Sequence, residues 1–381
     1  MSNLSIDFMG QRRVAAIFSS MLVIASLVGF FTNGLNLGLD FSGGTLIELE
    51  YDQAADLEQV RGVLRDKQFT NAVAVPFGSD TEVMIRFRGS FAEIATNRLN
   101  NILTEDLGSE ARVSSVDRMS SEYQSRVTVD QPGLADSRDQ LLPAVVFGDV
   151  VARNQKEGTE FLLRKDIDIA IADDLVKSLA DAAGAQVTKK RSEFVGPQVG
   201  EELIENAIWG GLTSLAVVML YVALRFQFKF SVGAVVALAH DVIIVLGLFA
   251  IFHWDFDLTV FAAILAVIGY SLNDTIVVSD RIRENFRKIR KGDSIEIINK
   301  SLNQTVGRTL VTSLTTLLVL SALFLIGGES IHNFSLALII GVIVGTYSSI
   351  YVAANTMLAM KISKEDLIVP VKEGAEFEEI P

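Results

Sequence analysis

Six long apolar runs constrain this chain more than any other feature of its 381-residue sequence. Charged residues make up 21% of the chain, yet each run contains one charged residue or none. A run of about 20 apolar residues is long enough to cross the hydrocarbon core of a bilayer as a helix. The sequence therefore predicts a polytopic α-helical membrane protein with six transmembrane helices. The predicted spans are residues 14–31, 207–224, 232–252, 258–278, 309–326 and 334–360.

The spans are distributed unevenly, with one near the N-terminus and five in close succession. Residues 1–33 hold the N-terminal end and the first span, and the polar residues 34–204 form one large domain after it. The other five spans occupy residues 205–360, and residues 361–381 form a tail. The first run resembles a signal peptide, but it exceeds the usual apolar region of about 7 to 15 residues. We therefore interpret it as a retained span.

Lysine and arginine in short loops predict the orientation, because they gather on the cytoplasmic side of a membrane. Basic residues precede span one, lie between spans two and three and between spans four and five, and follow span six. The turns on the opposite side, residues 253–257 and 327–330, contain neither lysine nor arginine. We expect both termini in the cytoplasm and the large domain outside it. The basic residues are Arg12, Arg13, Arg225, Lys229, Arg281, Arg283, Arg287, Lys288, Arg290, Lys291, Lys361 and Lys364.

The large domain combines two kinds of apolar periodicity. Alternating residues predict strands, and apolar residues three or four apart predict helices. Their order is a β-α-β rhythm, which is typical of an α+β domain of the ferredoxin-like kind. Residues 117–168, which contain Pro132 and Gly133, form the least regular part. Strands are expected at residues 45–51, 82–87, 111–116 and 185–187, and helices at 55–67, 91–103 and 173–183.

Composition excludes several classes of function. The chain has no cysteine, which rules out disulfides, thiolate metal sites and thiol catalysis. Its three histidines are too far apart for a histidine metal cluster, and its net charge of −13 argues against binding nucleic acid. Neither a Walker loop nor a GxSxG or HExxH motif is present. We expect no enzymatic activity, no cofactor and no metal.

Asp274 is a carboxylate within the fourth span, one to two helical turns from its cytoplasmic end. A charge inside a span costs about 2.5–3.5 kcal/mol, and such a residue usually faces a bundle interior or a water path. Burial favours the neutral acid while a nearby cation favours the carboxylate, so changing surroundings can change its protonation. A proton relay and a structural hydrogen bond between helices both remain open.

Arg308 opens the fifth span near the same cytoplasmic end, so its depth can match that of Asp274. It is either a cation that snorkels to the interface or a partner that holds the Asp274 carboxylate ionised. A guanidinium cannot give up its own proton near neutral pH.

His240 and Asp241 form a second polar pair, near the middle of the third span. Adjacent residues on a helix point about 100° apart, so we expect Asp241 to face inward and His240 not to share its partner. Asp241 could lie on a proton path, or it could make a hydrogen bond that packs helices together; the sequence leaves both roles open. Asn273 and Ser271 are supporting candidates that could line a wet seam, although hydroxyl groups in spans more often serve packing.

Three motifs lie at the ends of spans one, two and four. Residues 39–45 read LDFSGGT, residues 193–200 read EFVGPQVG, and residues 268–278 read IGYSLNDTIVV. With the plan of one span plus five, they resemble the SecF family, the smaller membrane subunit of the bacterial SecD–SecF complex. The motif residues are Asp40, Gly43, Gly44, Gly196, Pro197, Gly200, Ser271, Asn273 and Asp274.

The resemblance implies an inner-membrane protein that assists preprotein translocation with SecD and the SecYEG channel, using the proton motive force. Membrane lipid would surround six spans that form half of a twelve-span bundle of the resistance-nodulation-division superfamily. In that family an aspartate and an arginine at the places of Asp274 and Arg308 are implicated in proton movement. The large domain is longer than is usual there, so we expect an insertion at about residues 117–169. The alternatives are a proton-driven exporter of small molecules or lipids, and an uncoupled scaffold for SecD.

Overall fold

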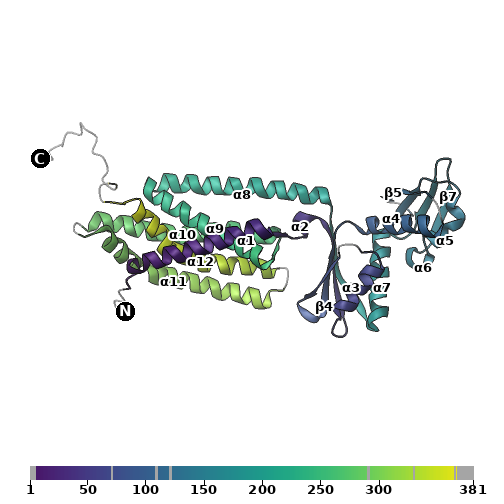
Figure 1. The fold of residues 1–381 in the computed structure, drawn as a ribbon, viewed down its shortest axis with the longest axis horizontal. Coiled ribbons are helices and arrows are strands. Elements are labelled where there is room, and N and C mark those ends of the chain that lie inside the picture. The colour runs from purple at the N-terminus through teal and green to yellow at the C-terminus, as the bar shows by residue number, and fades with distance from the viewer. Residues whose placement is uncertain are drawn as a thin grey trace. The chain divides into compact units, whose positions relative to one another are not determined.

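The computed structural model describes residues 6–69, 72–107, 110–119, 122–289, 292–328, 331–363 and 366. The chain divides into two compact units. One consists of Met1–Gly38 and Glu205–Pro381 and is helical, and the other is Leu39–Ile204 and contains two β-sheets (Figure 1). Of the predicted basic residues, Arg290, Lys291 and Lys364 lie outside the described part, as does most of the tail at residues 361–381.

Six helices in the described part of the chain are long and apolar enough to cross a membrane, as the sequence predicted. Polar turns extend several of them beyond the apolar runs, most clearly at the start of the fifth span. The helices are α1 (Arg12–Asn33), α8 (Pro197–Arg225), α9 (Phe228–Phe252), α10 (Leu258–Lys288), α11 (Ser294–Ile326) and α12 (His332–Ala359).

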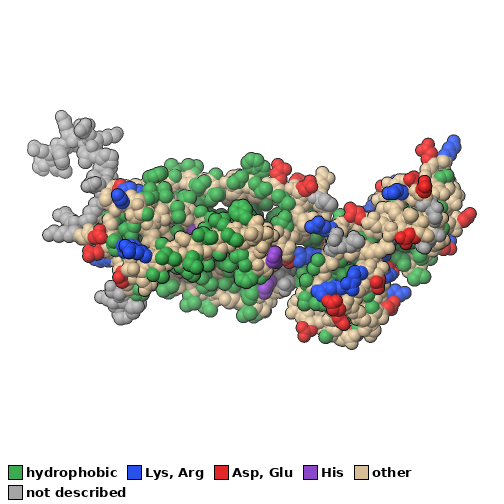
Figure 2. Space-filling model, in the orientation of Figure 1, with side chains coloured by type: hydrophobic (Ala, Val, Ile, Leu, Met, Phe, Trp, Pro, Cys, Tyr) green, Lys and Arg blue, Asp and Glu red, His purple; other side chains and the backbone are tan. Residues whose placement is uncertain are grey.

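The helical unit is built around α9, α10 and α12. Half of the most apolar stretch of α9 and of α10 is buried, and 44% of that of α12, against 11% for α8. Figure 2 shows hydrophobic side chains over the flank of this unit, with charged side chains near its ends. That distribution suits a surface in contact with lipid. The carboxylates of Asp257 and Asp293 cap α10 and α11 by accepting backbone N–H groups, at 2.8 Å from Val260 and 2.7 Å from Ser294.

Glycines allow the helices to approach closely. A Cβ atom at Gly247 of α9 would overlap both the backbone and the side chain of Ser26 of α1. A Cβ at Gly341 of α12 would overlap the side chain of Val267 of α10. Small residues at such crossings let membrane helices pack at short distance. A two-residue parallel bridge between β1 (Asn36–Leu37) and β10 (Asp255–Phe256) adds a contact beyond the end of α1.

The first sheet of Leu39–Ile204 is antiparallel with the strand order β3-β4-β2-β9. Alternation along β2 buries Ile47, Leu49 and Tyr51 to 3% exposure or less, whereas the residues between them stay half-buried. Gly44 has φ +124°, and a Cβ there would lie 2.5 Å from the carbonyl oxygen of Phe87, so this position requires glycine. The elements are β2 (Gly44–Tyr51), α3 (Leu57–Asp66), β3 (Val73–Phe77), β4 (Ser79–Phe87), α4 (Phe91–Asn101), α7 (Ile167–Ala183) and β9 (Val187–Val195).

A second four-stranded antiparallel sheet lies between α4 and α7 in the sequence, with the order β5-β6-β8-β7. The expectation that residues 117–168 are the least regular part of the domain is therefore wrong. Val127, Phe161 and Leu163 of this sheet are buried in the same hydrophobic cluster as the first sheet. The elements, after a π-helical turn at Ile102–Asp106, are β5 (Val113–Arg118), β6 (Ser125–Val129), η3 (Leu134–Ser137), α5 (Arg138–Leu141), α6 (Ala144–Phe147), β7 (Val150–Asn154) and β8 (Thr159–Leu163).

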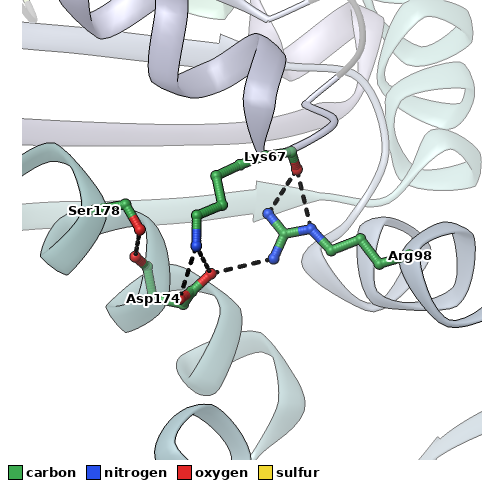
Figure 3. A network of polar contacts seen from close by, with 4 residues as sticks. All are labelled: Lys67, Arg98, Asp174 and Ser178. Carbon is green, nitrogen blue, oxygen red and sulfur yellow. Dashed lines mark hydrogen bonds and ion pairs between the residues drawn. The ribbon is translucent and has the colours of Figure 1, made fainter. Parts of the chain in front are cut away.

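A largely buried ion network joins α7, α4 and the end of α3 (Figure 3). Lys67 Nζ donates to both carboxylate oxygens of Asp174, at 3.0 and 2.9 Å, and Arg98 Nη1 donates to Oδ2 at 3.3 Å. Arg98 also donates twice to the backbone carbonyl of Lys67, at 3.0 and 2.6 Å, and stacks over Phe69. Burial lowers the pKa of the Arg98 guanidinium, and Asp174 opposes that shift. The network therefore fixes three helices of this unit to one another.

Candidate functional site

Asp274 lies in the interior of the helical unit. Its side chain comes from α10, is 3% exposed, and leaves Oδ2 buried without a hydrogen-bond partner among the described residues. The hydroxyl oxygens of Thr275 and Ser279 on the same helix, and of Thr309 on α11, are likewise buried and unpaired there. Buried polar atoms are normally hydrogen-bonded, so these four oxygens on two neighbouring helices are places where water can bind. The four oxygens could accept a proton or form hydrogen bonds with water.

Arg308 immediately precedes Thr309 on α11, and its side chain is exposed on the surface of the unit. It interacts electrostatically with Asp274. The two residues form no ion pair in the described structure, so the direct contact that matching depths allow is not made here. The arrangement leaves Asp274 without a fixed counter-ion, and leaves Arg308 at a surface that lipid or another protein would cover.

Asp241 of α9 is completely buried and makes three side-chain hydrogen bonds. His240 Nδ1 lies 2.8 Å from Oδ1, and the hydroxyl groups of Ser271 on α10 and Ser348 on α12 donate to Oδ2 at 2.5 and 2.7 Å. A Cβ at Gly345 of α12 would lie 3.1 Å from Cβ of Ser271, so glycine lets α12 approach α10 closely beside this carboxylate. Asp241 therefore holds three helices together.

Asp241 faces inward, and His240 beside it is also buried, at 6% exposure. α9 packs against α1, α10 and α12, so two directions about 100° apart are both covered by helices. The imidazole stacks on the ring of Tyr347 with centroids 6.3 Å apart. The Tyr347 hydroxyl donates to the carbonyl oxygen of Ala15 at 2.8 Å and lies 3.1 Å from Ser19 Oγ, both on α1.

The supporting candidates divide between the two environments. Ser271 is buried and bound to Asp241, whereas Asn273 is exposed on the outer surface of α10. Sequence reasoning missed Ser348 and Tyr347, which complete the cluster from α12. The spacing of Gly345, Ser348 and Ser349 on one helical face was the available signal, because such a small polar face marks a close helix contact.

The glycine motifs meet within the unit Leu39–Ile204. A Cβ at Gly200 would lie 2.8 Å from the carbonyl oxygen of Phe41 and 3.2 Å from the amide nitrogen of Gly43. The first turn of α8 therefore packs directly on the turn that contains Asp40, Gly43 and Gly44. A side chain at Gly200 would separate two segments that are distant in the sequence. Gly196 precedes this turn and Pro197 begins the helix, the position where a missing backbone N–H costs least.

The described residues contain no group of three or more histidine, aspartate or glutamate side chains placed to hold a metal ion.

Family models match both ends of the chain. Residues 28–55 match the family described as SecD/SecF GG Motif, and residues 175–363 match the family described as Protein export membrane protein SecD/SecF, C-terminal. The first match contains Asp40, Gly43 and Gly44, and the second contains Asp241, Asp274 and Arg308, among other candidate residues.

Individual relatives extend over nearly the whole chain. The protein translocase subunit SecF of Vibrio alginolyticus is 40% identical over 379 residues, covering 99% of this chain and 97% of that protein. SecF of Pseudomonas aeruginosa is 38% identical over 366 residues, covering 96% and 95%. A crystal structure of SecDF, a translocon-associated membrane protein from Thermus thermophilus, superposes with a TM-score of 0.65 at 31% identity. That match covers 94% of this chain but only 39% of the SecDF chain.

Proposed function

The chain belongs to the SecF family of protein translocase subunits, whose role is protein export, and we propose that it couples preprotein translocation to the proton motive force together with SecD. The chain spans about two-fifths of the SecDF chain it resembles. SecD would supply the other membrane half, and the SecYEG channel and a preprotein in transit would complete the assembly.

The observation that carries this proposal is Asp274. The Asp274 side chain is 3% exposed within a membrane span, and one of its oxygens is unpaired among the described residues. Burying a carboxylate there costs free energy, and acids in such positions usually belong to ion or proton pathways. Asp274, Arg308 and Asp241 would form the proton relay, with Ser271 and His240 in support. Neutralising Asp274 would remove its attraction to Arg308 and so change the preferred packing of α10 and α11.

The partner surface lies where polar side chains are exposed on membrane helices. Arg308 and Asn273 are exposed at positions that lipid tails would solvate poorly. If SecD covers this face of α10 and α11, it would provide hydrogen-bond acceptors to Arg308 and to Asn273. Asn273 therefore belongs to the proposed contact with SecD and not to the relay interior.

Motion of the spans would reach the large domain through its two short connections, residues 32–39 and 196–202. The contact of Gly200 with Phe41 and Gly43 joins the ends of both connections, so they would move together. One elementary charge crossing about 100 mV releases about 2.3 kcal/mol, enough to change a two-state equilibrium roughly fifty-fold.

The placement of the protein follows from the same proposal. Basic loops favour a multi-pass protein of the bacterial inner membrane with both termini in the cytoplasm and residues 34–204 in the periplasm. The order β-α-β-β-α-β of the first sheet, with strands arranged β3-β4-β2-β9, supports a ferredoxin-like classification for that part. The second sheet, which begins near Val113, would be the insertion that lengthens this domain relative to the usual SecF domain.

Proton flux through SecD–SecF in liposomes tests the proposal. Wild type, Asp274→Asn and Arg308→Ala would be compared at equal protein content, with Asp280→Asn as a control on the same helix. Asp280 is partly exposed and pairs with Arg225, so its loss should leave flux intact. Flux should fall at least tenfold in the first two variants. Equal flux in all four proteins would remove both residues from the relay.

A further inference from the structure

We propose that His240 and Asp241 act as one protonatable unit, in which the imidazole takes up and releases the proton and the carboxylate stays an acceptor. The proposal deepens the relay proposed above and rests on it for its purpose. It adds a second site of proton storage, which lies on α9 and involves no arginine.

The hydrogen bonds define what each group can do. Asp241 receives two hydroxyl donors and faces His240 Nδ1 at 2.8 Å, an arrangement that suits a carboxylate accepting on both oxygens. The nitrogen Nδ1 then carries a hydrogen, which leaves Nε2 as the atom that changes. Nε2 is buried and has no hydrogen-bond partner among the described residues. A proton delivered to Nε2 along the relay converts the imidazole to imidazolium and takes the pair from a net charge of −1 to zero.

The surroundings make that change of charge consequential. The helices packed against α9 are α1, α10 and α12. Residues 14–33 of α1 contain no titratable group, α12 contributes the phenol groups of Tyr347 and Tyr351, and α10 contributes Tyr270 and Asp274 within its span. No lysine or arginine of these spans faces the pair. The unprotonated pair is thus an uncompensated anion in an apolar interior, and the protonated pair is a neutral ion pair.

Two contacts transmit the state of the pair. The imidazole stacks on Tyr347, whose hydroxyl is bound to α1, so a positive ring would change the contact among α9, α12 and α1. Ser271 donates to Asp241 and lies three residues before Asp274, on the same face of α10. Protonation of His240 would therefore alter the strength of the hydrogen bond from Ser271 to Asp241. Through α10, it would also alter the surroundings of Asp274.

Histidine-selective ¹⁵N solid-state NMR on SecD–SecF in liposomes would test this directly. The chain contains three histidines, and unlabelled SecD leaves only their signals. The variants His253→Gln and His332→Gln would assign two of them, so His240 is identified in protein whose pair is intact. Spectra would be recorded from about pH 8 to about pH 5, where an imidazole titrates, for wild type, Asp241→Asn and Asp274→Asn.

We expect Nε2 of His240 to gain a proton across this range in wild type while Nδ1 keeps its own. In Asp241→Asn the ring should stay neutral throughout, because its counter-charge is gone, and in Asp274→Asn the titration should persist. If Nε2 of His240 in the wild type keeps the same protonation state over the whole pH range, that result alone overturns the proposal. So would a titration unchanged in Asp241→Asn. Proton flux measured on the same liposomes separates the two ideas, because a titrating His240 without flux would contradict only the relay.

Discussion

Burial should decide what each of two adjacent aspartates on α7 contributes to the stability of Leu39–Ile204. Asp174 pairs with Lys67 and Arg98, and its side chain is 13% exposed. Asp173 pairs with Lys165 and Lys189, and its side chain is 48% exposed. The two residues lie on the same helix, are of the same type, and each pair with two cationic side chains. Replacing each by alanine therefore changes helix propensity equally and isolates the environment of the carboxylate.

The structure allows the size of the effect to be worked out. Removing one partner of a buried ion pair costs about 3–5 kcal/mol, because a buried charge is left unpaired. Lys67 is 32% exposed and can turn toward water, whereas Arg98 is 17% exposed and remains tied to the Lys67 carbonyl. We therefore expect Asp174→Ala to cost about 2–3 kcal/mol. Asp173→Ala removes exposed pairs that are worth at most about 1 kcal/mol.

Hydrogen exchange of the α7 amides in the full-length protein measures both losses. Protection should fall about 30- to 150-fold in Asp174→Ala and at most about fivefold in Asp173→Ala. Equal losses in the two variants would refute the reasoning, since they would show that exposure does not set the contribution of these pairs. A loss below about fivefold in Asp174→Ala would refute it as well.

Two further predictions concern packing and alkaline pH. Gly247→Val should destabilise the helical unit by about 1–3 kcal/mol in thermal unfolding, because the side chain overlaps Ser26; Gly210→Val, with no atom within 4 Å of its Cβ, is the control, and equal effects would contradict the packing argument. Burial raises the pKa of Tyr51 to about 12, so its folded state favours the neutral phenol. That stabilisation is complete below about pH 10, the unfolded value, and is lost as the pH rises through the folded pKa. Tyr51→Phe should abolish this part of the alkaline loss in chemical unfolding, and an unchanged pH dependence would show that Tyr51 does not titrate differently on folding.

The spans were predictable because lipid imposes a simple requirement. Runs of apolar residues with at most one charge match α1, α9 and α12 closely. The first half of α11, residues 294–308, was not expected as helix, because its amphipathic pattern carries no membrane signal. It is held in place by contacts distant in the sequence, such as the buried bond from Asn285 to Ser301 and the bond from Asn303 to the carbonyl oxygen of Ile6.

The large domain was only partly predictable. Strong alternation identified β2 and the second half of β4, whereas β3 contains Pro76 and gives little strand signal. The strands of the second sheet are five or six residues long and are stabilised by their neighbours, so local pattern reveals them poorly. The longer extent of α7 has a clearer origin, since the Asp166 cap lies before the apolar stretch that was recognised.

The candidate residues show the same division. An acid within an apolar membrane span almost always faces the bundle interior, because exposure to lipid is costly. The burial of Asp274 therefore follows from its position. Whether Arg308 contacts it depends on the relative rotation of α10 and α11, which a single sequence does not encode locally. The bond from Ser348 to Asp241 joins residues 107 positions apart, and no spacing rule relates them.

Proton-driven stimulation of preprotein translocation tests the central claim most directly. Inverted vesicles that contain SecYEG, SecD and either wild type or Asp274→Asn, at equal levels of assembled complex, would be assayed with and without a proton motive force. The account predicts that the variant assembles with SecD but loses the stimulation that wild type gives. Full stimulation by Asp274→Asn would contradict it and leave the chain as an uncoupled scaffold.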